Sequence, residues 1–240
     1  MKRILITGAS SGIGQQLAHD YAADGWQVVA CGRSLHKLEQ ALADIDFEPC
    51  VFDVQDKDAI HAAVDHLAPF DVVLLNAGNC EYIDDVMQFD AELFARVVSV
   101  NLLGTANCLP AVLPRIKSGG RLAVVSSSVS ILPLTRSEAY GASKAGLDYL
   151  VRTLAIDLVP HNIAVSLIRP GFVETPLTQK NDFPMPGQVT VKTASKVIRK
   201  GIAKGKSEIS FPVSLVTALR LLSWLPNGLW RRMAQSLVRG

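Results

Sequence analysis

Residues 3–14 read Arg-Ile-Leu-Ile-Thr-Gly-Ala-Ser-Ser-Gly-Ile-Gly, a short apolar run that ends in a glycine-rich turn. The apolar run predicts a strand buried on both faces. Gly8, Gly12 and Gly14 would let the backbone turn tightly and approach a pyrophosphate, and the N-terminus of the helix that follows favours negative charge. We therefore expect this turn to bind a dinucleotide, although a tight turn without a ligand would carry the same glycines.

Strand and helix patterns alternate along the whole chain. The short β-branched runs are residues 3–7, 27–31, 49–52, 72–76, 121–126 and 164–169. This alternation predicts an α/β fold with a doubly wound parallel sheet in a single domain, because right-handed crossovers through helices connect parallel strands. Ligands of such sheets bind beyond the carboxyl ends of the strands. The residues that end the runs are Gly8, Gly32, Asp53, Asn76, Ser127 and Pro170-Gly171.

The composition excludes several classes of protein. The 240 residues carry 24 Lys and Arg against 22 Asp and Glu, so the net charge of +2 predicts no nucleic-acid partner. The four cysteines show no Cys-x-x-Cys spacing and resemble buried thiols of a reducing compartment, and we expect no metal site. We expect a cytoplasmic protein without a cleavable signal. The apolar stretch 211–225 is too short to span a membrane.

Tyr140 and Lys144 stand four positions apart in a segment with a helical pattern. At that spacing the phenol and the ammonium lie one above the other. A tyrosine with an ordinary pKa of about 10 is a poor base near neutral pH, and a nearby cation lowers that pKa. The pair suits acid/base chemistry on an alcohol or a ketone, whereas a solvated pair on a helix surface is the alternative.

The order and spacing of these motifs resemble the short-chain dehydrogenase/reductase family over residues 1–178. The motifs are the glycine turn, Asp53, Asn76-Ala77-Gly78, Asn101, Ser127, Tyr140, Lys144 and the run 169–175. The resemblance implies a Rossmann-like fold and a nicotinamide-dependent oxidoreductase. Residues 179–240 would then form a substrate loop and a C-terminal helical tail.

The resemblance also implies a role for each catalytic residue. Tyr140 would donate the proton to a carbonyl oxygen, and Lys144 would hold the nicotinamide ribose and lower the pKa of the tyrosine. Among three consecutive serines the family spacing selects Ser127 to polarise the substrate oxygen, with Ser128 as the alternative. Asn101 would anchor a proton-relay water, and an ordinary polar helix residue is its alternative.

The cofactor residues follow from the same resemblance. They are Gly8, Ser10, Ser11, Gly12, Ile13, Gly14, Arg33, Asp53, Val54, Asn76, Ala77, Gly78, Tyr140, Lys144, Pro170, Gly171, Val173 and Thr175. The alternatives are a helix cap for Asp53, a turn residue for Asn76 and a loop cap for Thr175.

The choice of cofactor depends on the end of the second predicted strand. Gly32-Arg33-Ser34 lacks the acid that usually holds the ribose hydroxyls of NAD, and a guanidinium suits a 2′-phosphate. NADP is therefore favoured over NAD. The alternative is that Arg33 lies in solvent or stacks on adenine, and Ser11 stands where a basic residue often occurs in relatives that prefer NADP.

We expect hydride transfer between NADP(H) and an alcohol or ketone, with a 3-oxoacyl thioester reductase as the alternative. An NADP-binding redox sensor is the non-enzymatic alternative. An apolar substrate is suggested, if they line the pocket, by Phe183, Met185, Phe211, Trp224 and Trp230, and the alternative is that they belong to the core. The tail from Ile209 has four Arg and no acid, and could cover the site, pack on a partner subunit or contact a membrane surface without spanning it. A homodimer or homotetramer is expected. The stripe Leu147, Leu150, Leu154 and Leu158 could serve its contact, although some of these leucines would face the sheet in a monomer.

Overall fold

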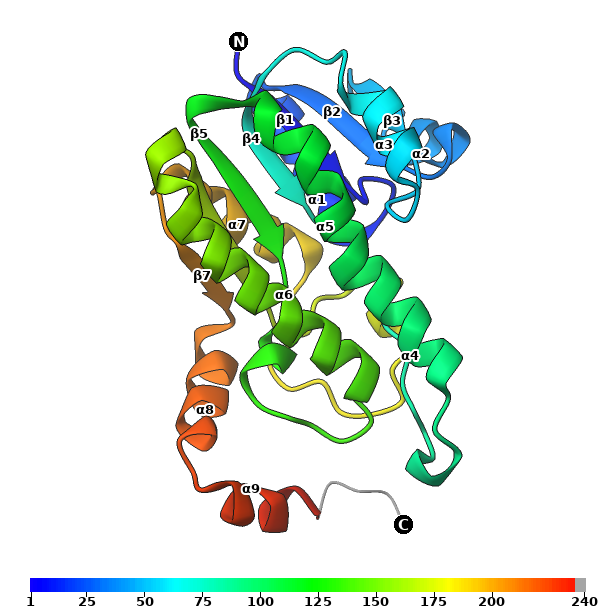
Figure 1. Cartoon of the computed structure of the whole chain (residues 1–240), viewed down its shortest axis with the longest axis vertical. Coiled ribbons are helices and arrows are strands. Elements are labelled where there is room, and N and C mark those ends of the chain that lie inside the picture. Colours follow the sequence, from blue (N-terminus) through cyan, green and yellow to red (C-terminus); the bar gives the residue numbers. More distant parts are fainter. Residues whose placement is uncertain (236–240) are drawn as a thin grey trace.

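Residues 1–235 are described by a computed structural model, and within them seven strands form one parallel sheet in the order β3-β2-β1-β4-β5-β6-β7 (Figure 1). The strands are β1 (Arg3–Thr7), β2 (Gln27–Gly32), β3 (Glu48–Val51), β4 (Phe70–Leu75), β5 (Ile116–Val125), β6 (Ala164–Pro170) and β7 (Glu208–Phe211). The chain moves outward from β1 to β3 and then returns to β4 on the other side of β1. A crevice for a ligand is expected at this reversal.

Six of these strands match the six predicted runs, and β5 begins at Ile116 rather than at Arg121. The seventh, β7, was not predicted. It has only four residues, and the half-buried Glu208 and Ser210 alternate with the buried Ile209 and Phe211. A strand this short with two polar residues gives no apolar run, so Phe211 was assigned to the stretch that follows.

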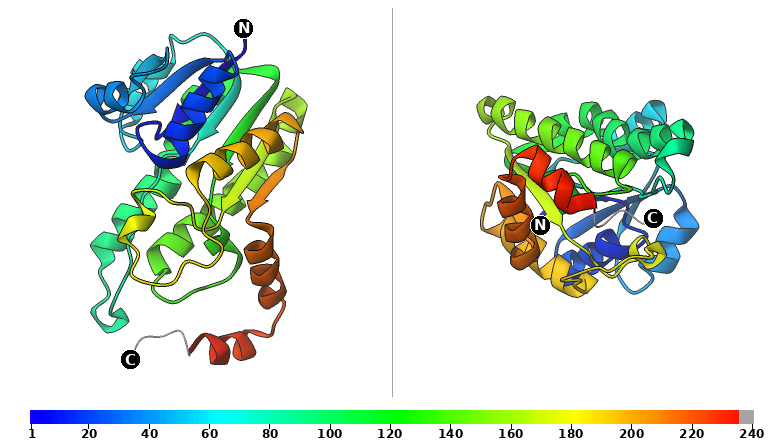
Figure 2. Two further views of the ribbon diagram at one scale, coloured as in Figure 1. Left: turned by 180° about the vertical axis from the view of Figure 1, so that it is seen from behind. Right: turned by 90° about the horizontal axis from the view of Figure 1, so that it is seen from below.

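Helices cover both faces of the sheet, which confirms the doubly wound arrangement. The helices are α1 (Gly12–Ala23), α2 (Leu35–Ala41), α3 (Lys57–Val64), α4 (Ala91–Val98), α5 (Gly104–Val112), α6 (Glu138–Asp157), α7 (Val191–Ala203), α8 (Val213–Ser223) and α9 (Asn227–Ala234). Helices α1 and α7 lie side by side on one face, and α5 and α6 lie on the other (Figures 1 and 2). Each face therefore has its own apolar core.

The leucine stripe of α6 points into one of these cores. Leu147 and Leu158 are buried in it, and Leu150 and Leu154 pack against it. Leu147 and Leu158 therefore face the sheet, as expected for some of the stripe in a monomer, and a subunit contact through the partly buried Leu150 and Leu154 stays a prediction. The outward face of α6 carries the exposed side chains of Tyr149 and Ile156.

One helical run, Ala91–Arg115, is long and apolar enough to cross a membrane by length and composition alone. It consists of α4, a π-helical turn at Ser99–Leu103, α5 and a final turn. Cys108, Leu109 and Val112 of this run pack in the core between α5 and the sheet. Such a run is typical of a core helix as well as of a membrane span. Helix α8, in the stretch 211–225, has only 11 residues.

Helices α8 and α9 extend from the end of β7, beyond the carboxyl ends of the strands (Figure 1). Val216 and Leu219 of α8 are buried, so the first part of this tail belongs to the body of the protein. Trp224 is 81% exposed. In α9 the Trp230 Nε1 donates a hydrogen bond to the Pro133 carbonyl oxygen at 3.0 Å. The last five residues of the predicted tail, 236–240, lie outside the described residues.

Candidate active site

A cavity of about 350 Å³ opens at the carboxyl ends of the central strands. It is lined by all but one of the predicted cofactor residues: Gly8, Ser10, Ser11, Gly12, Ile13, Arg33, Asp53, Val54, Asn76, Ala77, Gly78, Tyr140, Lys144, Pro170, Gly171, Val173 and Thr175. Gly14 is not in its wall. Ser126 and Ser127 line it as well, whereas Asn101 and Ser128 do not.

The glycine turn has the geometry that a pyrophosphate site requires. Gly8 and Gly12 have φ angles of 69° and 55°, the left-handed region that favours glycine. A Cβ on Gly14 would lie 2.3 Å from the Gly8 carbonyl oxygen, so this glycine lets α1 pack close to the turn. The Ser11 side chain makes no capping hydrogen bond, and no acid stands in the first turn of α1. The N–H groups of that turn therefore remain available to an anion.

Hydrogen bonds tie this turn to the next strand. The Asn76 side chain donates to the Thr7 carbonyl oxygen at 3.1 Å, and the backbone N–H groups of Asn76 and Ala77 both donate to the Thr7 hydroxyl. Asn76 therefore holds the ends of β1 and β4 together beside the cavity. Asn76 was predicted either to support the cofactor site or to be an ordinary turn residue, and its hydrogen bonds fit both interpretations.

Arg33 lies on the rim of the cavity with its side chain 76% exposed. Its Nη1 is 3.8 Å from Oδ2 of Asp53, the nearest acid recorded for it. Asp53 accepts a hydrogen bond from the Gln55 N–H at 2.9 Å, while Asp56 is the residue that caps α3. The guanidinium therefore keeps most of its donors free for an incoming anion.

Helix α6 brings Tyr140 and Lys144 to the inner end of the cavity. The Lys144 Nζ donates to the Val125 carbonyl oxygen at 3.0 Å and lies 5.8 Å from the centre of the Tyr140 ring. Burial lowers the pKa of Lys144 to about 8. Burial also raises the pKa of Tyr140, and a hydrogen bond with Ser127 acts in the opposite direction. The expectation that Lys144 lowers the tyrosine pKa is not met here, because burial outweighs the lowering influence and that influence comes from Ser127.

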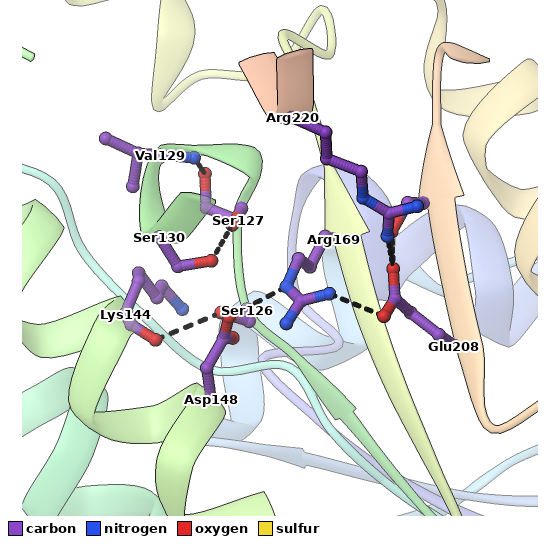
Figure 3. Close-up of polar contacts among 10 residues, drawn as sticks. Ser126, Ser127, Val129, Ser130, Lys144, Asp148, Arg169, Glu208 and Arg220 are labelled. Atoms are coloured by element: carbon purple, nitrogen blue, oxygen red, sulfur yellow. Dashed lines mark hydrogen bonds and ion pairs between the residues drawn. The ribbon is translucent and has the colours of Figure 1, made fainter. Parts of the chain in front are cut away.

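Only one of the three serines is placed against the tyrosine. Ser127 lines the cavity and accepts from the Val129 N–H at 3.3 Å (Figure 3). It also forms a hydrogen bond with Tyr140. The Ser126 hydroxyl donates to the Lys144 carbonyl oxygen at 3.3 Å. Ser128, the predicted alternative, is buried away from the cavity. This placement favours Ser127.

Asn101 lies in the π-helical turn and is fully buried. Its Oδ1 accepts from the Asn79 N–H at 2.8 Å, and its Nδ2 donates to the Asn79 carbonyl oxygen and the Ser143 hydroxyl. These contacts position the segment that follows β4 against α6. The predicted binding of a water by Asn101 stays a prediction.

Thr175 lines the cavity and also caps its own loop, as the alternative interpretation held. Its N–H donates to the Thr178 hydroxyl at 3.0 Å, and its Cγ2 would be 3.1 Å from a Cβ on Gly12. The loop after β6 is therefore fixed next to the glycine turn.

An aromatic group lies near Tyr140, and its member Tyr82 was not predicted. The Tyr82 ring packs edge-on to Phe183 at 5.4 Å, and Phe183 lies 6.1 Å from Phe172. Burial raises the pKa of Tyr82, and Cys80 and Tyr140 are near enough to add to that effect. No motif marks Tyr82, because it stands in an irregular segment whose position depends on contacts distant in sequence.

The loop 181–190 is held over this group. The Tyr82 hydroxyl donates to Asn181 Oδ1 at 3.0 Å. Arg136 lies over the Tyr82 ring and forms ion pairs with Asp84, before α4, and with Asp182 in the loop. We call Arg136, Asp84 and Asp182 the arginine latch. Phe183 packs against Tyr82 and does not line the cavity, and Trp224 is exposed, so a role for either in a substrate pocket stays a prediction.

Among residues 1–235, no group of three or more His, Cys, Asp or Glu side chains could hold a metal ion.

A family model described as short chain dehydrogenase matches residues 2–184. An uncharacterized oxidoreductase of Myxococcus xanthus is 37% identical over 97% of this chain and 96% of its own length. The 3-dehydrosphinganine reductase TSC10A of Arabidopsis thaliana is 31% identical over 90% of this chain and 74% of its own length.

A solved structure agrees with these relatives. The short-chain dehydrogenase from Sphingobium yanoikuyae in complex with NADPH superposes with a TM-score of 0.81 at 25% identity, covering 100% of this chain and 97% of its own. The chain belongs to the short-chain dehydrogenase family of oxidoreductases.

Proposed function

We propose that the protein reduces an apolar ketone with NADPH, and oxidises the corresponding alcohol in reverse, through Ser127, Tyr140, Lys144 and Asn101. The observation that carries this proposal is the meeting of Ser127, Tyr140 and Lys144 in the same cavity as the glycine turn. A nucleotide site alone would not need a phenol, a hydroxyl and an ammonium at one end.

NADPH supplies the hydride when it is bound. The Tyr140 hydroxyl, whose raised pKa keeps its proton in place near neutral pH, donates that proton to the substrate oxygen. The Ser127 hydroxyl, already in contact with Tyr140, hydrogen-bonds the same oxygen. Lys144 supplies positive charge at the base of the cavity, and Asn101 holds the segment after β4 against α6.

The cofactor is NADP(H). The open turn of α1 suits the pyrophosphate, and the exposed guanidinium of Arg33 suits the 2′-phosphate. No acid follows β2 to hold the ribose hydroxyls of NAD in its place. The solved relative with bound NADPH supports the same choice.

The aromatic group of Tyr82, Phe172 and Phe183 supports an apolar substrate, because Tyr82 lies near Tyr140 and Phe183 packs between Tyr82 and Phe172. A relative named as a reductase of 3-dehydrosphinganine is consistent with the reducing direction. A 3-oxoacyl thioester reductase is the second candidate, and an NADP-binding redox sensor is the third.

The test uses purified protein with NADPH or NADH and three carbonyl compounds: a long-chain ketone, a short-chain ketone and a 3-oxoacyl thioester. We expect the fastest loss of nicotinamide absorbance with NADPH and the long-chain ketone. Turnover of the thioester alone would select the second candidate. Tight binding of NADPH without turnover of any carbonyl compound would select the redox sensor.

We also propose a homodimer or homotetramer in the cytoplasm. The exposed apolar Tyr149 and Ile156 on α6 support self-association, and the four free cysteines support a reducing compartment.

A further inference from the structure

A row of charges, of which the inner pair is buried, begins one helical turn after Lys144. The Asp148 Oδ2 accepts from the Arg169 Nε at 2.7 Å, and the Arg169 Nη1 lies 2.8 Å from Glu208 Oε2 (Figure 3). Glu208 then pairs with Arg220 of α8. We call Asp148, Arg169, Glu208 and Arg220 the charge row. It joins α6, which carries Tyr140 and Lys144, to β6, β7 and the tail.

The inner pair of this row is poorly explained as a source of stability. The Arg169 side chain is 2% exposed and that of Asp148 10%. Removing both charges from water costs several kcal/mol for each ion, and an apolar pair of the same volume would hold α6 on β6 as well or better. Asp148 Oδ1 is also buried without a hydrogen-bond partner. We therefore look for a neighbouring group whose charge Asp148 and Arg169 influence.

The charge that Asp148 acts on is the ammonium of Lys144. Lys144 is 4% exposed, and its recorded hydrogen bond goes to a neutral acceptor, the Val125 carbonyl oxygen. Burial lowers its pKa, while Cys80 and Asp148 oppose that effect. Burial raises the pKa of the Cys80 thiol, so this group is neutral near pH 7. Asp148 is then the anion among these neighbours that favours the charged lysine.

Arg169 limits how strongly Asp148 favours the charged form of Lys144. The guanidinium lies on the opposite side of the carboxylate, and Glu208 in turn neutralises part of the guanidinium charge. The groups that face Lys144 are Tyr140 and Asp148 on α6 and Cys80 after β4, with Arg169 of β6 behind Asp148.

We propose that Asp148 and Arg169 are positioning residues that together set the charge of Lys144 beside Tyr140, Asp148 by facing the ammonium and Arg169 by pairing with Asp148, and that Glu208 and Arg220 fix this pair in place. This inference rests on the proposed function of Lys144. It predicts that the two partners act on the lysine in opposite directions. Asp148 favours the ammonium, and Arg169 disfavours it. A pair that only tied α6 to β6 would change stability when broken and would leave the titration of Lys144 unmoved.

The test follows Lys144 by NMR in protein labelled with [ε-¹³C]lysine, with its signal assigned by its loss in Lys144→Arg. We expect Asp148→Asn to lower the titration midpoint of Lys144 by about half a pH unit or more, because an anion is removed. Arg169→Gln should raise the midpoint, and the double variant should return it toward the wild type. The alkaline limb of kcat/KM for ketone reduction should move in the same directions.

The matched control is Asp157→Asn, which removes an exposed carboxylate from the same helix, about 20 Å from Lys144 along the helix axis. It should leave the midpoint unchanged. If Arg169→Gln does not fold, Asp148→Asn against Asp148→Glu carries the test, because the glutamate keeps the charge and should keep the midpoint close to that of the wild type.

Unchanged midpoints in folded Asp148→Asn and Arg169→Gln, or shifts of both in one direction, would overturn the proposal. The NMR titration needs neither cofactor nor substrate. Opposite shifts in a protein that turns over no carbonyl compound would therefore sink the proposed function and leave the control of the Lys144 charge standing.

Discussion

Tyr140 is subject to two opposing influences, since burial raises its pKa and the hydrogen bond with Ser127 lowers it. Burial is the larger influence. A phenol that keeps its proton is suited to donate it, which agrees with the reducing direction. In the oxidising direction the same residue must first lose that proton, so alkaline pH should favour alcohol oxidation.

Replacing Tyr140 by Phe should abolish ketone reduction, because the Ser127 hydroxyl that remains is an aliphatic alcohol and a far weaker acid than a phenol. NADPH affinity should stay within about threefold of the wild type, since only one hydroxyl is lost. Steady-state kinetics and fluorescence titration of NADPH measure the two quantities. Substantial residual turnover would remove Tyr140 from the mechanism.

Replacing Arg33 by Ala should weaken NADPH binding by about 1.5–3 kcal/mol, the range for a hydrogen bond to a charged group. NADH binding should change little, because NADH has no 2′-phosphate. Calorimetric titration with both cofactors checks this. An equal loss for both would instead indicate stacking on adenine or damage to the rim of the cavity.

For single residues, the sequence predicted the position correctly where a local motif determines it. Lys144 follows Tyr140 by one helical turn, and the glycines of the first turn need neighbours only a few residues away. Tyr82 was missed because Asn181 and Phe183 place it from about a hundred positions downstream. The pKa of Tyr140 was mistaken because burial cannot be read from the spacing of Tyr140 and Lys144.

Among the elements, the loop 181–190 is attached at its Val189 end by backbone hydrogen bonds to Phe172 and Glu174 and at its other end by the arginine latch. The arginine latch holds it through exposed carboxylates, with the side chains of Asp84 and Asp182 76% and 54% exposed. Ion pairs of this kind stabilise by about 0.2–1 kcal/mol each. The loop can therefore open at small cost, which suits an element that must admit a substrate.

Arg136 has a φ of 62°, so Asn is a suitable replacement that removes the charge and tolerates the left-handed backbone. Arg136→Asn should raise KM for the ketone by about two- to tenfold, because two exposed ion pairs no longer favour the closed loop. NADPH affinity should be retained. Arg152→Ala, which removes an exposed arginine of α6, is the control in the same assay.

A KM for Arg136→Asn equal to that of the wild type would show that the arginine latch plays no part in substrate binding. Asp84→Asn and Asp182→Asn break the same ion pairs without touching the Arg136 backbone, and each should show part of the effect.

The tail divides into two parts with different roles. Removing everything after Ser210 would cut β7 and take away the buried Phe211, Val216 and Leu219, so that truncation would damage the core. Truncation after Leu225 keeps α8 and removes α9 with its Trp230 contact to Pro133. A truncation must therefore leave β7 intact, and the sequence pattern alone did not predict that strand.

The protein truncated after Leu225 should have a higher KM for long-chain ketones than the full chain, with little change for short ones, because α9 contacts the segment next to the site. Binding of NADPH should be unchanged. If the truncated protein keeps its ketone preference but no longer sediments with anionic liposomes, the tail serves a membrane surface instead.

For the molecule as a whole, the α/β class, the doubly wound sheet and the position of the cavity could be predicted from the alternation of strands and helices. The surface that a second copy of the chain would contact could not be predicted in this way. The leucine spacing on α6 is the same whether the stripe faces the sheet or a partner. Only the packed structure shows that Leu147 faces inward and Tyr149 outward.

We expect light scattering at micromolar protein to give a mass of at least twice the chain mass of 25.9 kDa. The double variant Tyr149→Asp and Ile156→Asp should lower it toward the monomer, because charge is placed on the exposed apolar face of α6. Val86→Asp, at another exposed apolar position, should leave it unchanged. A monomeric wild type would exclude a stable oligomer.

The two edge strands of the sheet, β3 and β7, determine whether the sheets of two molecules can pair edge to edge. β3 and β7 each have four residues, and β3 contains Pro49, which has no N–H to donate. Glu48 and Glu208 place a carboxylate on each edge, and the exposed Lys204 and Lys206 precede β7. Short, charged or proline-bearing edges resist the edge-to-edge pairing that leads to aggregation. The sheet thus stays closed to foreign strands while the helical faces remain free to associate.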